Sequence, residues 1–104
     1  MQTLALAELI DYRDHQIASK SFGRKLNIAL PFVAYALDAG ESISNEQSRL
    51  TRLIQVVDGT LTVVQDGATA VPTGAMIVIP AGTPHALEAR TRCKFIQMET
   101  APRG

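Results

Sequence analysis

Short runs of apolar and β-branched residues recur from Leu26 onward, and the turn signals between them constrain the fold of this chain most strongly. Asp58-Gly59 supplies the positive backbone φ angles that a tight hairpin turn requires, and Asp66-Gly67 marks another turn. Between these dipeptides, Thr60 to Gln65 alternates apolar and polar side chains, which is the period of a half-buried strand. Many short strands with almost no helix predict an all-β fold, built as a sandwich or a barrel.

The expected strands fill most of the chain. Leu4 to Tyr12 has apolar residues at helical spacing and predicts one or two helical turns, whereas Tyr12 to Phe22 is polar and predicted to be extended. Pro31 lies inside the first apolar run and predicts an edge or a bulge there, because proline donates no ladder hydrogen bond. Ala75 to Ile79 is wholly apolar and predicts a strand covered on both faces, in a closed barrel or at a subunit contact. Strands are expected at Asn27 to Leu37, Leu53 to Val57, Thr60 to Gln65, Ala68 to Val71, Ala75 to Ile79, Ala86 to Ala89 and Cys93 to Met98.

Length and charge bound the possible partners. A chain of 104 residues has the size of one domain, so we expect a single domain over residues 1–104 with a core barrel at about 26–98. So small a barrel leaves modest stability for a monomer, which together with the apolar strand predicts a homodimer. The ten basic and ten acidic side chains cancel and are scattered, so no basic surface is expected for nucleic acid or an anionic membrane.

The cysteine content and the first residues indicate the compartment. Cys93 is the one cysteine, which excludes an internal disulfide, and its apolar neighbours predict a buried, unreactive thiol. Met1 to Ile10 is apolar but contains Glu8 and lacks a basic leader, so it does not resemble a signal peptide. No apolar stretch approaches the roughly 20 residues that span a membrane. We therefore expect a cytoplasmic protein.

The stretch from Gly74 to His85 reads GAMIVIPAGTPH. Gly74 allows a tight entry into an apolar strand, and Pro80 and Gly82 then turn the chain so that His85 points into the mouth of the barrel. This stretch resembles the second conserved motif of the cupin superfamily at its defining positions. The resemblance implies a cupin jelly-roll β-barrel in which the histidine is a metal ligand, and the helical turns expected within Leu4 to Tyr12 would form a short N-terminal helical segment before it. The asparagine usual in the family falls at Ala89 and is absent here.

The first cupin motif aligns by its two outer glycines, Gly40 and Gly59. The three ligand positions of that motif then fall on Glu46, Ser48 and Arg52. The resemblance extends from Leu26 to Met98. The flanking segments, Ala18 to Phe22 and Leu37 to Ser44, are similar to those of small stand-alone bacterial cupins, a subgroup mostly of unassigned function.

A mononuclear cupin metal usually takes three histidines and one carboxylate. This chain offers His85 and, as a replacement, Glu46, whereas serine is a poor ligand for the metals of such sites and His15 is expected at the solvated surface. Arg52 is permanently charged, and about 4 Å from a divalent ion it would repel that ion by roughly 8 kcal/mol at an effective dielectric of 20. We therefore favour no cofactor, with a single divalent transition metal as the alternative.

By strand alternation, Glu46, Ser48 and Arg52 share the interior face unless a bulge intervenes. One interpretation is a Glu46–Arg52 ion pair that replaces the metal as a structural cross-link, because a buried cation must be paired. The other is a ligand site in which Arg52 and His85, with Glu46 and Ser48 beside them, recognise a small carboxylate or another anion.

Three functions fit this pattern. The favoured one is a metal-poor barrel that binds a small molecule, with a carboxylate as one possible ligand. The second is an enzyme: an oxygenase if a metal is present, or a metal-free isomerase or lyase with His85 as acid or base, which would need a carboxylate such as Glu46 to orient the imidazole. The third is a structural dimer module whose core is closed. The sequence names no substrate.

Overall fold

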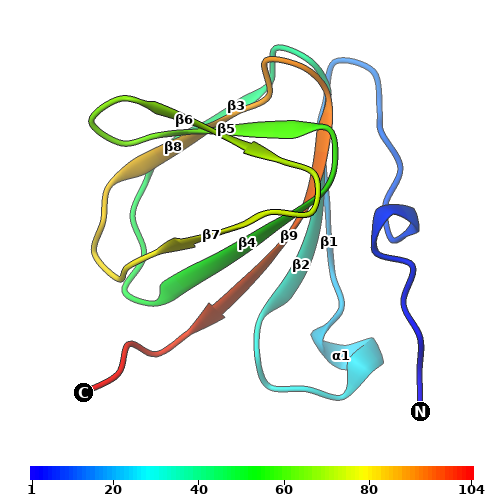
Figure 1. Cartoon of the computed structure of the whole chain (residues 1–104). Helices are drawn as coiled ribbons and strands as arrows, with labels where there is room; N and C mark the ends of the chain where they lie inside the picture. The colour runs from blue at the N-terminus through cyan, green and yellow to red at the C-terminus, as the bar shows by residue number, and fades with distance from the viewer.

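Two antiparallel sheets face each other across the core in this computed structural model (Figure 1). The structure describes residues 1–104, with the exception of the side chain of Asn45. The larger sheet has the strand order β1-β2-β9-β4-β7 and the smaller sheet the order β3-β8-β5-β6. This arrangement confirms the predicted all-β jelly roll. Among the described residues, no helix is both long and apolar enough to cross a membrane.

The elements follow one another with short connections. In chain order they are a 3₁₀ helix η1 (Leu6–Glu8), β1 (Ile17–Ser21), α1 (Gly23–Leu26), β2 (Phe32–Leu37), β3 (Ser42–Glu46), β4 (Thr51–Asp58), β5 (Thr60–Val64), β6 (Ala68–Pro72), β7 (Met76–Ile79), β8 (His85–Glu88) and β9 (Cys93–Thr100).

The N-terminal segment lies on the outer face of the larger sheet. The predicted helical turn is confirmed as η1, and the neighbouring Leu9 and Ile10 pack with Ala34 and Ile96 in a second apolar cluster outside the barrel. The short helix α1 was not expected from the sequence. It ends at Asn27, whose φ of 55° is the left-handed conformation that terminates helices.

Two sequence expectations, one for Pro31 and one for Asp58-Gly59, are wrong. Pro31 lies just before β2, and β2 is flanked by β1 and β9, so the proline marks neither an edge nor a bulge. Asp58-Gly59 does not close a hairpin, because β4 and β5 belong to different sheets. The chain instead turns a corner there, and a Cβ atom at Gly59, which has a φ of 71°, would overlap the carbonyl oxygen of Arg92. Asp66-Gly67, by contrast, joins β5 to β6 as a hairpin with positive φ at both residues, as expected.

The apolar strand β7 is covered on one face only within this chain. Ile79 packs into the core, whereas Met76 and Val78 on the opposite face are 47% and 54% exposed. The expectation of two covered faces therefore fails for the single chain.

Apolar side chains from both sheets fill the space between them. Tyr35 of β2 stacks on Phe95 of β9 with ring centroids 4.9 Å apart. Cys93 is fully buried as predicted, and burial, assisted by the charge of Asp58, raises the pKa of its thiol to about 11. The buried core comprises Leu37, Ile54, Val56, Leu61, Val63, Val71, Ile79, Leu87, Ala89, Cys93 and Phe95.

Candidate functional site

Polar side chains from four strands, three of them charged, meet at one end of this filled core. Glu46 at the end of β3 lies opposite His85 at the start of β8 in the smaller sheet. Arg52 of β4 lies opposite Glu99 of β9 in the larger sheet. The two cross-strand pairs face each other across the barrel. We call these four residues the arginine cluster.

The connection after β3 is fixed to the turn that precedes β8. The backbone N–H of Gly82 donates to the carbonyl of Ser48 over 2.7 Å, and the side chain of Gln47 donates to the carbonyl of Gly82 over 3.1 Å. Gly82 has a φ of 80°, which glycine adopts without strain. The two segments that resemble cupin motifs are thus held together by these two hydrogen bonds, and this sets the position of the side chains between them.

Arg52 is the centre of the cluster. Its Nε donates to Oε2 of Glu99 over 3.3 Å, and its Nη1 lies 3.6 Å from Oε1 of Glu46 and 3.2 Å from Nε2 of His85. The arginine side chain is 11% exposed, against 20% for Glu99 and 36% for Glu46. A guanidinium removed from water needs such partners, because an unpaired buried charge is strongly unfavourable.

The hydrogen bonds of His85 define its tautomer. Its Nδ1 lies 2.9 Å from the carbonyl oxygen of Thr83, which can only accept, so Nδ1 carries the proton. Nε2 is then the acceptor for the N–H of Arg52. The ring is held as a neutral imidazole with both nitrogens engaged, and its orienting partner is a backbone carbonyl rather than a carboxylate.

Ser48 extends the network beyond the arginine. Its hydroxyl donates to Oε2 of Glu99 over 2.6 Å and accepts the backbone N–H of Leu50 over 3.1 Å. One guanidinium, two carboxylates and a neutral imidazole leave one negative charge in excess. The cluster is therefore internally paired but not neutral.

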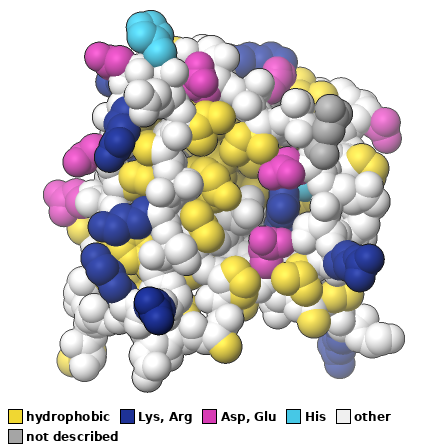
Figure 2. Space-filling model, turned by 180° about the vertical axis from the view of Figure 1, so that it is seen from behind, with side chains coloured by type: hydrophobic (Ala, Val, Ile, Leu, Met, Phe, Trp, Pro, Cys, Tyr) yellow, Lys and Arg dark blue, Asp and Glu magenta, His cyan; other side chains and the backbone are white. Residues whose placement is uncertain are grey.

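An apolar surface adjoins this charged group. Tyr35 is half-buried, and burial raises the pKa of its hydroxyl, while the charge of Arg52 lowers it and those of Glu46 and Glu99 raise it further. Figure 2 shows hydrophobic side chains gathered at the centre of one face, with acidic and basic groups and part of a histidine beside them. A separate hollow of about 430 Å³ also reaches His85, from the ends of β5 and β8.

The structure brings together all four residues predicted for the site, although β3 contains a register shift between Ile43 and Glu46. The predicted Glu46–Arg52 ion pair is present. His85 is buried, whereas His15 is exposed at the surface. Glu99 was missed, because it belongs to neither motif. Alternation along β9 from the buried Cys93 was the available signal, since it directs every second residue inward and so reaches Glu99.

These residues do not fit a divalent metal as they are placed. The lone pair of His85 Nε2 that would bind a metal accepts a hydrogen bond from Arg52, so an ion there would meet the guanidinium. Within the described part of the chain, no group of three or more His, Cys, Asp or Glu side chains is arranged to hold a metal.

Comparison with known proteins identifies the fold. No family model matches the chain, and no curated protein matches it by sequence. A conserved protein of unknown function from Streptococcus pyogenes superposes with a TM-score of 0.84 at 23% identity, over 99% of this chain and 90% of that one. A cupin superfamily protein from Desulfitobacterium hafniense gives 0.84 at 23%, over 97% and 92%. A cupin 2 conserved barrel domain protein from Leptotrichia buccalis gives 0.83 at 28%, over 93% of this chain and 47% of that protein. The chain thus has the fold of the cupin superfamily.

Proposed function

We propose that this cupin-fold chain binds a small molecule at the mouth of its barrel, where the arginine cluster occupies the region of the metal ligands in related motifs. The observation that carries the proposal is a partly exposed polar network on a face where hydrophobic side chains gather beside charged groups (Figure 2). Ligand sites usually combine such a surface with a few well-placed polar groups. The filled core restricts the ligand to the mouth.

The charge of the cluster favours a neutral or cationic ligand. A carboxylate would have to share a guanidinium that already has Glu46, Glu99 and His85 as partners. It would also approach two carboxylates, the more exposed of which is Glu46. From the sequence, Arg52 suggested an anion as the ligand. This proposal instead favours a ligand whose polar group donates hydrogen bonds.

Benzylamine, benzyl alcohol and benzoate form a matched series of probes for this site. We expect backbone NMR signals of Tyr35, Glu46 and His85 to shift with the amine and the alcohol at lower concentration than with benzoate. Glu46→Gln should weaken the amine about fivefold relative to the alcohol, because it removes one partly screened charge. Glu8→Gln, on η1 outside the barrel, is the control. Absence of saturable shifts at the mouth with all three probes would count against the proposal.

A structural dimer module is the second candidate, and a different observation favours it. The core is filled, and Met76 and Val78 remain exposed on an outer sheet face. A homodimer that covers this face would bury both. Sedimentation of the natural chain at micromolar concentration should then give twice the mass of 11.2 kDa, and Val78→Lys should return it to the monomer. A natural chain that sediments as a monomer excludes this candidate.

The enzyme alternative has less support. A general base needs a free nitrogen, and both nitrogens of His85 are engaged, by Thr83 and Arg52. Glu46, named from the sequence as the orienting carboxylate, contacts Arg52 instead.

A further inference from the structure

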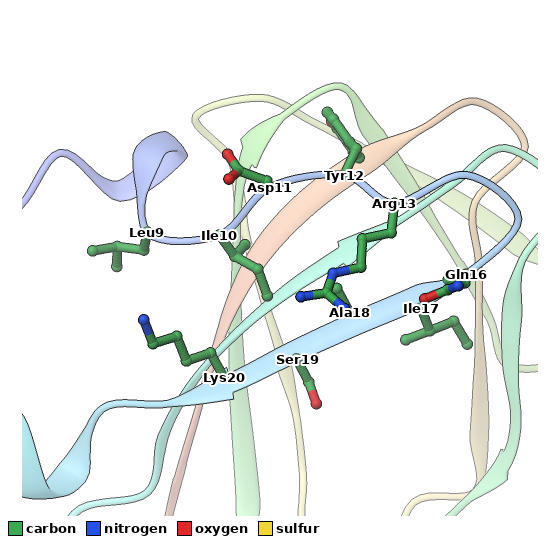
Figure 3. Close-up of a pocket in the computed structure, with 10 residues that line it drawn as sticks. All are labelled: Leu9, Ile10, Asp11, Tyr12, Arg13, Gln16, Ile17, Ala18, Ser19 and Lys20. Carbon is green, nitrogen blue, oxygen red and sulfur yellow. The ribbon is translucent and has the colours of Figure 1, made fainter.

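A second hollow lies outside the barrel, between the N-terminal segment and the edge of the larger sheet (Figure 3). Its volume is about 630 Å³, within the range of small-molecule sites. One wall is β1, which pairs with β2 only and so leaves its other edge open to the hollow. The lining residues are Leu9, Ile10, Asp11, Tyr12, Arg13, Gln16, Ile17, Ala18, Ser19 and Lys20. We call this space the N-terminal hollow.

Two cationic side chains line this hollow without a carboxylate partner. In Figure 3 the side chains of Arg13 and Lys20 extend into the space between the segment and β1, whereas the carboxylate of Asp11 points away from it. Among the ion pairs of the described residues, none includes Arg13 or Lys20. Lys20 has only a contact with the ring of Phe22, 5.3 Å from its centroid. The positive charge here is available to a ligand, unlike that of Arg52.

The outer wall of the N-terminal hollow is anchored at several points. Lys94 donates to the carbonyl of Ala7 over 2.7 Å, and the hydroxyl of Tyr12 donates to Asp58. The backbone N–H of His15 donates to Asp38 over 2.7 Å. A wall fixed in this way loses little conformational freedom when a ligand binds, so a modest number of contacts suffices.

Polar atoms make up most of the exposed surface of this hollow, and Leu9, Ile10 and Ala18 offer a smaller hydrocarbon surface beside the two cations. We propose that the N-terminal hollow binds a small organic carboxylate whose apolar body packs on these residues while Arg13 and Lys20 pair with its charge. This site is independent of the arginine cluster and has the opposite charge preference.

Hexanoate, hexan-1-ol and hexylamine test this proposal, because they share a chain and differ in charge. NMR titration of the full chain should give saturable shifts at residues 9–20 with hexanoate at the lowest concentration. Arg13→Gln combined with Lys20→Gln should raise the Kd for hexanoate about tenfold, as expected for two exposed ion pairs. The Kd for hexan-1-ol should stay within a factor of two. Raising the salt from about 0.02 to 0.5 M should weaken hexanoate selectively.

A matched control is Arg24→Gln with Lys25→Gln, which removes two cations from α1 and leaves the hollow intact. It should leave the Kd for hexanoate unchanged. Equal binding of hexanoate and hexan-1-ol, or an equal loss in both double variants, would overturn the carboxylate site. So would shifts confined to residues outside 9–20.

Discussion

Arg52 and Arg92 have similar partners in very different surroundings. Arg52 contacts Glu46, Glu99 and the ring of His85, and its side chain is 11% exposed. Arg92 contacts Asp14 at 3.7 Å, Asp38 at 3.2 Å and the ring of Tyr12 at 4.4 Å, and its side chain is 49% exposed. The number of contacts is the same, so burial decides what each arginine contributes. A buried partner left alone is costly, whereas an exposed partner is solvated by water.

The largest effect is expected at Arg52. Arg52→Met should lower the free energy of unfolding by about 3–5 kcal/mol, because it leaves two carboxylates facing each other without their cation. Adding Glu46→Gln and Glu99→Gln should recover most of the loss, since the repulsion disappears. Urea denaturation measures both variants. If the single and triple variants are equally unstable, packing rather than charge is the contribution of Arg52.

Replacing the guanidinium of Arg52 by a metal ion tests the buried site in a second way. The combination of Glu46→His, Ser48→His and Arg52→Glu supplies a three-histidine, one-carboxylate set together with His85, and Glu99 lies opposite position 52. Zinc should bind this variant far more tightly than the natural chain and should stabilise it by about 2.7 kcal/mol at one hundred times its Kd. Calorimetry and melting with and without Zn²⁺ provide the measurement. A folded variant with the affinity of the natural chain would show that the motif positions do not correspond.

Removing the charge of Arg92 should lower the free energy of unfolding much less than removing that of Arg52. Arg92→Met is expected to cost less than about 1 kcal/mol of stability, because exposed ion pairs are weak. That cost should fall further at high salt, whereas the cost of Arg52→Met should change little. Denaturation of both variants at low and high salt separates them. Similar costs at both positions would remove burial as the explanation.

The smallest expected effect is on the pH dependence of stability, through Asp38. Hydrogen bonds from the backbone N–H groups of His15 and Ala39, aided by Arg92, lower the pKa of Asp38. A carboxyl with a lowered folded-state pKa adds stability above its unfolded value, and this stability is lost as the pH falls through the folded value. Asp38→Asn should therefore flatten the acid side of the stability profile below about pH 4 and barely change it at pH 7. A parallel shift at both pH values would contradict this.

The sequence predicts the strands and the site to different extents. Spacing from Gly74 to His85 and from Gly40 to Gly59 places four site residues together, because such spacing encodes local backbone geometry and not the identity of the side chains between the fixed positions. The tertiary partner Glu99 is not encoded in either motif. Likewise, the dipeptide Asp58-Gly59 indicates a sharp turn but not which sheet the chain enters next, which depends on how the two sheets pack.

The N-terminal hollow illustrates the same limit. Arg13 and Lys20 lie in a polar stretch whose composition resembles any solvated segment. Their common environment arises only because Tyr12 and Ala7 are held by residues far along the chain, Asp58 and Lys94. Local patterns cannot predict contacts of that range.

The reactivity of Cys93 provides a measure of how often this barrel opens. The thiol is fully buried, is the one sulfhydryl of the chain, and has a pKa of about 11, so at neutral pH a thiol reagent has almost no thiolate to attack in the closed form. Modification must then wait for the sheets to separate. The rate of thiol modification therefore reports how often the sheets separate, with no introduced label. The same measurement on the Arg52 and Arg92 variants reports how often each of those barrels opens under native conditions.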